Sequence, residues 1–186
     1  MSFPSGSFPA GERLRFRLPS PDDAAFYHRL MNEPDYIRFI ADHGVKTIDD
    51  ASRYIEAKSL ARFATFGVGL WVVELKETAE PIGICGLVVR KELTYPDLGF
   101  AFLAAFRGRG LGREAGQAVL TLASDGLKLR TLCAITHPDN VRSANLLKKI
   151  GFEAHGQRHL TEIGETSDYY LWQQSDVESG LAQAAP

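Results

Sequence analysis

Apolar and charged residues alternate at the start of the chain. Residues 13–18 (RLRFRL) place arginine and apolar side chains in turn, which is the period-two pattern of a half-buried strand. Ser20, Pro21 and Asp23 follow as a capping residue, a proline suited to the first helical position and an acid in the first turn. This signal predicts a first helix that ends near Pro34.

A second helix start and a hairpin come next. Thr47 with Asp50 repeats the capping pattern, and apolar residues recur at roughly helical spacing over the following turns. The β-rich runs 69–76 (GLWVVELK) and 81–90 (PIGICGLVVR) are separated by a short turn. They predict an antiparallel hairpin.

The second half of the chain alternates strands and helices. Each apolar run is bounded by glycine, proline or a capping residue. The predicted elements are a strand at 98–103, a helix ending at Gly126, a buried strand at 131–136, a helix at 141–150, and strands near 152–160 and 168–174. This order predicts one mixed α/β layer structure whose central part is parallel.

Length and composition bound the protein class. The chain has 186 residues, 45% hydrophobic and 24% charged, which suits one domain with one core. We expect that domain over residues 11–175, with tails at 1–10 and 176–186. Apolar runs are too short for a membrane span, and the first residues lack signal-peptide character. The expected location is the cytoplasm, without membrane contact.

Charge and metal-binding residue types exclude further classes. The 21 basic and 23 acidic residues give a net charge of −2, which argues against nucleic acid as a partner. Cys85 and Cys133 lie in apolar runs and are expected to be reduced core residues. His155 and His159 share a predicted strand but lie too far apart along it to hold one ion, so no metal is expected.

One short segment departs from this neutral background. Residues 107–113 (RGRGLGR) combine three arginines with three glycines at alternate positions, between a predicted strand and a predicted helix. Backbone N–H groups exposed at a helix start favour an anion such as a pyrophosphate. The segment does not match the strict dinucleotide motif GxGxxG, and no P-loop triplet GK[ST] is present. A solvated glycine loop and an RNA contact are the alternatives.

The segment and its surroundings resemble a known family. DLGFAFLAAFRGRGLGREA and THPDNVRSANLLKKIGF are similar to the GNAT N-acetyltransferases, in particular to the branch that acetylates ribosomal-protein N-termini. The resemblance implies a single-domain α/β fold of the acyl-CoA N-acyltransferase type. Its mixed central sheet would have about seven strands, with about four helices. It also implies acetyl-CoA as co-substrate.

The resemblance assigns the cofactor site residue by residue. Two central strands, 98–103 and 131–136, would splay apart, so that backbone groups of Ala101, Phe102 and Leu103 pair with the pantetheine arm. Asn140 matches an asparagine that binds the same arm. The pyrophosphate would be held by Arg107, Gly108, Arg109, Gly110, Leu111, Gly112 and Arg113.

The implied reaction is direct attack of a neutral amine on the acetyl thioester. A backbone N–H near Phe102 or Leu103 would stabilise the oxyanion. Ser143 would protonate the leaving thiolate, because the tyrosine that other branches carry is Leu147 here. Asp97 is the candidate base, acting through a water. His137 is the alternative base.

Acceptor chemistry follows from amine pKa values. At pH 7 the neutral fraction of an α-amine, with a pKa of about 7.8, exceeds that of lysine roughly 400-fold. A weak base therefore favours a protein N-terminal α-amine. Polyamines, aminoglycosides, amino acids and a non-catalytic acyl-CoA-binding module stay open, and sheet-edge pairing permits a homodimer.

Overall fold

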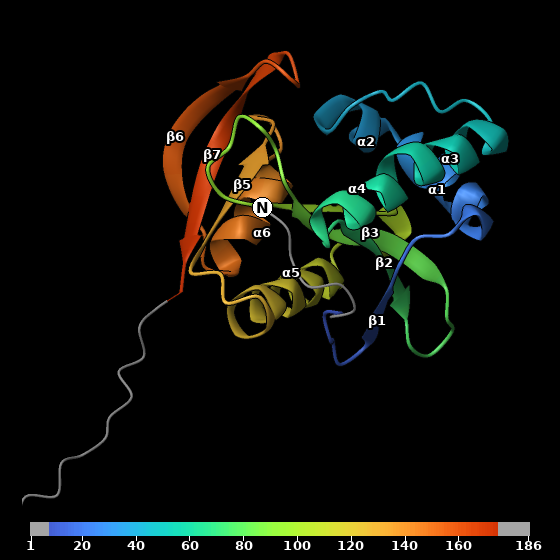
Figure 1. Ribbon diagram of the computed structural model, residues 1–186, viewed down its shortest axis with the longest axis horizontal. Coiled ribbons are helices and arrows are strands. Elements are labelled where there is room, and N and C mark those ends of the chain that lie inside the picture. The colour runs from blue at the N-terminus through green and yellow to red at the C-terminus, as the bar shows by residue number, and fades with distance from the viewer. Residues whose placement is uncertain (1–7, 175–186) are drawn as a thin grey trace, which may run out of the picture.

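The computed structural model describes residues 8–174, which form one mixed sheet with helices on both faces (Figure 1). The seven strands lie in the order β1-β2-β3-β4-β5-β7-β6. The predicted tails at 1–10 and 176–186 fall largely outside the described residues. The strands are β1 (Leu14–Arg17), β2 (Leu70–Leu75), β3 (Pro81–Val88), β4 (Asp97–Phe102), β5 (Thr131–Thr136), β6 (Glu153–Leu160) and β7 (Glu165–Gln173).

Six α-helical segments occur within the described residues. They are α1 (Ala24–Met31), α2 (Pro34–Phe39), α3 (Ile48–Tyr54), α4 (Ala61–Phe66), α5 (Leu111–Thr121) and α6 (Val141–Lys149). A π-helical stretch joins α3 to α4, and another extends α5 to Gly126. The α/β fold class, the seven strands and the antiparallel β2–β3 hairpin are thereby confirmed.

Local capping chemistry starts the helices on the N-terminal side. The Thr47 hydroxyl accepts a hydrogen bond from the Asp50 amide at 3.1 Å, and Asp50 accepts one back from the Thr47 amide at 2.9 Å. Ser20 and Asp23 form the corresponding pair before α1. Helix α1 ends at Met31, close to the predicted end near Pro34. Pro34 itself begins a further helix, α2, because proline suits the first helical turn as well as it breaks an interior one.

The sheet buries two separate apolar faces because successive strand residues point in opposite directions. Val73 on β2 packs in the core beneath α5, with Val119 of that helix. Its neighbour Val72 packs on the other side, with Tyr27 and Ile55. Cys85 and Cys133 are buried free thiols, as predicted. No helix within the described residues has the length and apolar character that membrane crossing requires.

The only parallel strand pair in the sheet diverges after one residue pair. Asp97 of β4 lies opposite Cys133 of β5, and the Cys133 amide donates to the Pro96 carbonyl at 3.0 Å. Beyond this point β5 continues to pair with β7 as far as Thr136. β4 continues to pair with β3 as far as Phe102. The sheet is therefore open between β4 and β5 at its centre.

Two facing glycines on β3 and β4 allow a stability prediction. A Cβ on Gly86 would collide with the Gly69 carbonyl oxygen, whereas one on its partner Gly99 would meet the flexible end of Leu70 at 3.2 Å and a methyl group of Val88 at an ordinary 3.5 Å. Gly86→Ala should lower the free energy of unfolding by about 3 kcal/mol, and Gly99→Ala by less than about 1 kcal/mol. Urea unfolding of both variants measures this difference, and equal losses would contradict it.

Candidate active site

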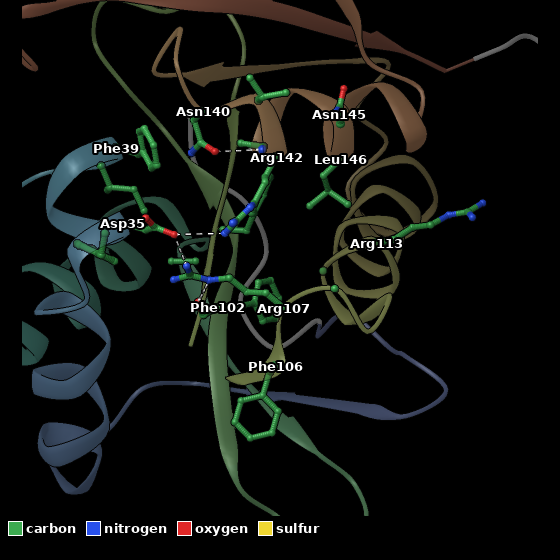
Figure 2. Close-up of a pocket in the computed structure, with 18 of the residues that line it drawn as sticks. Asp35, Phe39, Phe102, Phe106, Arg107, Arg113, Asn140, Arg142, Asn145 and Leu146 are labelled. Atoms are coloured by element: carbon green, nitrogen blue, oxygen red, sulfur yellow. Dashed lines mark hydrogen bonds and ion pairs between the residues drawn. The ribbon is translucent and has the colours of Figure 1, made fainter. Parts of the chain in front are cut away.

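A cavity of about 1060 Å³ opens where β4 and β5 diverge (Figure 2). Its walls come from α2, the end of β4, the loop into α5 and the first turns of α5 and α6. The residues that line it include Asp35, Phe39, Phe100, Phe102, Arg107, Gly110, Gly112, Arg113, Asn140, Arg142 and Ser143. Basic side chains outnumber acidic ones along these walls.

The β4 backbone presents unpaired groups toward the opening. The Leu103 amide donates to the Ile82 carbonyl at 2.9 Å, so its N–H is already used within the sheet. Because hydrogen-bonded and non-bonded pairs alternate between antiparallel strands, Ala101 also points its polar groups at β3. Phe100 and Phe102 point theirs toward the gap. The open edge is thus offset by one residue from the prediction at Ala101 and Leu103.

Glycines shape the start of α5 into an anion cradle. Gly108 and Gly110 adopt positive φ angles of 73° and 77°, which L side chains rarely adopt. The first helical bond runs from the Glu114 amide to the Gly110 carbonyl at 3.1 Å, so the amides of Leu111, Gly112 and Arg113 precede it. These amides and the helix dipole favour a bound anion at this end of α5.

The three arginines of the segment have different surroundings. The Arg107 side chain forms ion pairs with Glu33 and Asp35. Arg109 is exposed and lies over the Phe106 ring, 5.7 Å from its centroid. Arg113 lines the cavity and extends outward from α5 (Figure 2). Arg113 and Arg109 could therefore approach a phosphate without breaking any ion pair seen in the described residues, whereas Arg107 could not.

Asn140 and Ser143 lie together at the start of α6. The Asn140 side-chain oxygen accepts a hydrogen bond from the Ser143 amide at 3.1 Å, which makes Asn140 the helix cap. Both side chains line the cavity. The cap fixes the position of the first turn and leaves the Asn140 amide nitrogen available to a ligand.

His137 lies at the end of β5, just outside this cavity. Its Nδ1 accepts a hydrogen bond from the Asp139 amide at 3.1 Å, and its ring centroid lies 5.7 Å from that of Phe39. The ring is partly exposed. It is therefore held by the turn that follows β5, with Nδ1 engaged.

Asp97 is a buried carboxylate at the point where the strands part. One oxygen accepts a hydrogen bond from Arg90 Nε at 2.9 Å, and only 3% of the side chain is exposed. The other oxygen has no partner with full hydrogen-bond geometry in the described structure, although the Ile135 amide is near enough to favour the charged form. Burial outweighs these effects and raises the pKa of Asp97 above its usual value.

Glu33 and Asp35 are site residues that the sequence analysis missed. They flank Pro34 at the start of α2, and both carboxylates reach Arg107. The sequence signal for them is the acid–proline–acid run typical of a helix start, which the prediction of a helix end near Pro34 did not use. Glu114 has a structural role, since its carboxylate accepts hydrogen bonds from both the amide and the guanidinium of Arg13.

The acetyltransferase (GNAT) domain family matches residues 13–153 of this chain. The chain therefore belongs to the GNAT acetyltransferases, enzymes that transfer acetyl groups from acetyl-CoA to amines. A curated relative is the uncharacterized protein YkkB of Bacillus subtilis, 27% identical over 143 residues, which cover 75% of this chain and 81% of YkkB.

Two solved structures share the fold. An acetyltransferase from Agrobacterium tumefaciens superposes with a TM-score of 0.75 at 25% identity, over 94% of this chain and 99% of its own. The aminoglycoside acetyltransferase AAC(6')-Ib, solved with paromomycin and acetyl-CoA, superposes with a TM-score of 0.72 at 20% identity, over 93% and 100%. At these identities the likeness concerns the fold.

The Arg90–Asp97 pair yields a prediction with a defined pH dependence. Arg90→Met leaves a buried carboxylate without its partner and should lower the free energy of unfolding at pH 7 by about 3 kcal/mol. A raised pKa means that the folded state binds the extra proton, so the loss should shrink as pH falls toward the pKa of Asp97.

Urea unfolding at pH 7 and pH 4.5 measures this effect. The double variant Arg90→Met/Asp97→Asn is the control, because it removes the buried charge together with its partner. It should be less pH-dependent than Arg90→Met alone. A loss for Arg90→Met that is constant with pH would show that the carboxylate is not the source.

Proposed function

We propose that this protein transfers the acetyl group of acetyl-CoA to a primary amine by direct attack on the thioester. The observation that carries the proposal is that the anion cradle of α5 and the open edge of β4 face the same cavity. A pyrophosphate and an extended amide-containing arm are the two parts of coenzyme A that need these two surfaces. No other part of the described structure combines them.

The residues present fit the cofactor. The amides of Leu111, Gly112 and Arg113 would hold the pyrophosphate, and Gly108 and Gly110 let the loop approach it. The Phe100 backbone would pair with the pantetheine arm as an added strand, and the Phe102 N–H is left for the acetyl group because Arg107 already binds the Phe102 carbonyl. Asn140 would donate its amide to the same arm. Arg107 serves the loop rather than the phosphates in this arrangement.

The transfer requires a hydrogen-bond donor for the oxyanion, an acid for the leaving thiolate and a base for the amine proton. The amine nitrogen forms a bond to the thioester carbon, and the resulting oxyanion accepts a hydrogen bond from the Phe102 N–H at the open edge. The carbon–sulfur bond then breaks. The Ser143 hydroxyl gives its proton to the thiolate and takes one up from solvent water, and the proton that the amine loses passes through water to a base.

Asp97 is our proposed base, with His137 as the second candidate. Burial raises the pKa of Asp97 and so makes it a stronger base than an exposed aspartate. It lies where β4 and β5 diverge, and because its side chain is buried, a water in the gap would have to connect it to the amine. His137, which like Asp97 is not part of the cavity lining, has Nδ1 engaged by the Asp139 amide, so only Nε2 could accept a proton.

A protein N-terminal α-amine is the proposed acceptor. A carboxylate base favours an amine that is already partly neutral at pH 7, and the sequence resembles the branch that acts on ribosomal proteins. A small-molecule amine is the second candidate, since AAC(6')-Ib shares the fold and was solved with an aminoglycoside. A cytoplasmic location and a homodimer stay predictions.

A free-thiol release assay over several amine classes tests this function. N-terminal peptides, polyamines, aminoglycosides and amino acids are each offered with acetyl-CoA, and mass spectrometry locates the added acetyl group. We expect turnover with one peptide class at its α-amine. If acetyl-CoA stabilised the protein against heat but no amine caused release of the coenzyme A thiol, the binding module would be supported instead.

Ser143→Ala gives a separate prediction about protonation of the leaving group. Without the hydroxyl the thiolate departs unprotonated, so turnover should fall by about 100-fold while the affinity for acetyl-CoA changes less than about threefold. Steady-state kinetics with calorimetric binding separates the two quantities. Ser143→Thr, which keeps a hydroxyl, should retain more activity, and a wild-type rate in Ser143→Ala would remove this residue from the mechanism.

A further inference from the structure

Arg107 uses all three of its guanidinium nitrogens on protein acceptors. Nε donates to the Phe102 carbonyl at 2.8 Å, one terminal nitrogen donates to Asp35 at 2.6 Å, and the other donates to Glu33. The Arg107 side chain is 27% exposed and that of Glu33 is 17% exposed. The bond between Arg107 and Glu33 is therefore largely shielded from solvent, and charge-assisted hydrogen bonds are stronger when they are shielded. Asp35 is more open, with 42% of its side chain exposed.

Glu33 also binds the backbone of the cofactor loop. Its carboxylate accepts a hydrogen bond from the Ala104 amide, 2.8 Å from one oxygen and 3.1 Å from the other. β4 ends at Phe102, and Ala104 follows it after one residue, Leu103. One carboxylate thus joins the α1–α2 junction both to the end of β4 and to Arg107, residues that are 71 and 74 positions away in the sequence.

The same helix is joined to the opposite wall of the cavity. The Asp35 carboxylate also forms an ion pair with Arg142 of α6 at 3.4 Å, and the dashed lines in Figure 2 join Asp35 to both arginines. The guanidinium of Arg38 lies 3.6 Å from the carboxylate of Asp139, which belongs to the turn before α6. The helix α2 therefore spans the cavity and contacts the cofactor loop at one side and the start of α6 at the other.

We infer that Glu33, Asp35 and Arg107 form a clamp that positions α2 as a wall of the coenzyme A cavity, and that Arg107 is not a phosphate ligand. The inference rests on the proposed function, because it takes this cavity as the cofactor site. Two carboxylates and the Phe102 carbonyl engage all three nitrogens of the Arg107 guanidinium, so a phosphate would have to compete with acceptors that are already in place. The family-based assignment of Arg107 to the pyrophosphate is thereby replaced.

The clamp and a purely electrostatic role predict opposite effects for Glu33→Gln. Removing a negative charge beside an anion site should tighten coenzyme A binding if charge alone matters. If the clamp positions α2, the loss of its charge-assisted bonds should weaken binding instead. Glutamine keeps the shape of the side chain and can still accept from the Ala104 amide, so the variant is expected to fold.

Two ligands and one structural readout test the clamp. Calorimetry gives the affinities for coenzyme A and for pantetheine, which lacks phosphate, and hydrogen exchange follows the α2 amides. Glu33→Gln should weaken both ligands by about tenfold and speed exchange in residues 37–41 by about tenfold. Asp35→Asn should act in the same direction. Glu56→Gln, the control, makes the same chemical change at an exposed residue that takes no part in the clamp, and it should bind coenzyme A as tightly as the wild type.

Arg107→Gln in the Glu33→Gln/Asp35→Asn background tests the phosphate alternative without leaving excess negative charge. If the clamp is correct, this substitution should change the affinities for coenzyme A and for pantetheine by similar factors, which agree within about threefold. A loss of tenfold or more for coenzyme A alone would make Arg107 a phosphate ligand and overturn the inference.

Two further results would also overturn the clamp. They are tighter or unchanged coenzyme A binding in Glu33→Gln, and weaker binding with α2 exchange unchanged. If the wild-type protein did not bind coenzyme A, the proposed function would fail. The exchange rates would then still decide whether the clamp orders α2.

Discussion

The separation of β4 from β5 is the constraint on which the site depends. Two strands that part at Asp97 and Cys133 leave backbone donors and acceptors at the centre of the sheet without strand partners. Buried backbone groups need partners, so the gap must be filled by water or by a ligand with amides of its own. Strong pairing of β4 with β3, and of β5 with β7, keeps the gap from closing.

Local signals predicted most of the fold, because they act between neighbouring residues. The alternation in residues 13–18, the Thr47–Asp50 capping pair and the glycine run before α5 each state a backbone preference that the structure realises. The prediction that Ala101 and Leu103 face the open edge of β4 differs from the structure for a physical reason. Which residues point polar groups into the gap depends on register with β3, and register is a relation between distant segments.

The function of Arg107 illustrates the same limit for side chains. Its spacing from the glycines fits a phosphate signature, and nothing nearby in the sequence suggests another partner. The competing carboxylates of Glu33 and Asp35 lie more than 70 residues earlier and reach Arg107 only after α1 and α2 pack on the sheet. A charged residue in a motif therefore needs its tertiary ion pairs known before its ligand can be assigned.

The environment of Asp97 restricts the order of proton transfer. Burial raises its pKa above the usual value, and Arg90 opposes that shift. As the proposed base, a carboxylate is poorly matched to removing a proton before attack from a lysine-like ammonium, whose usual pKa is about 10.4. It can accept a proton from the much more acidic ammonium that forms once the nitrogen has bonded to the thioester carbon. The acceptor must then arrive neutral, which is the condition that an α-amine meets far more often than a lysine side chain at neutral pH.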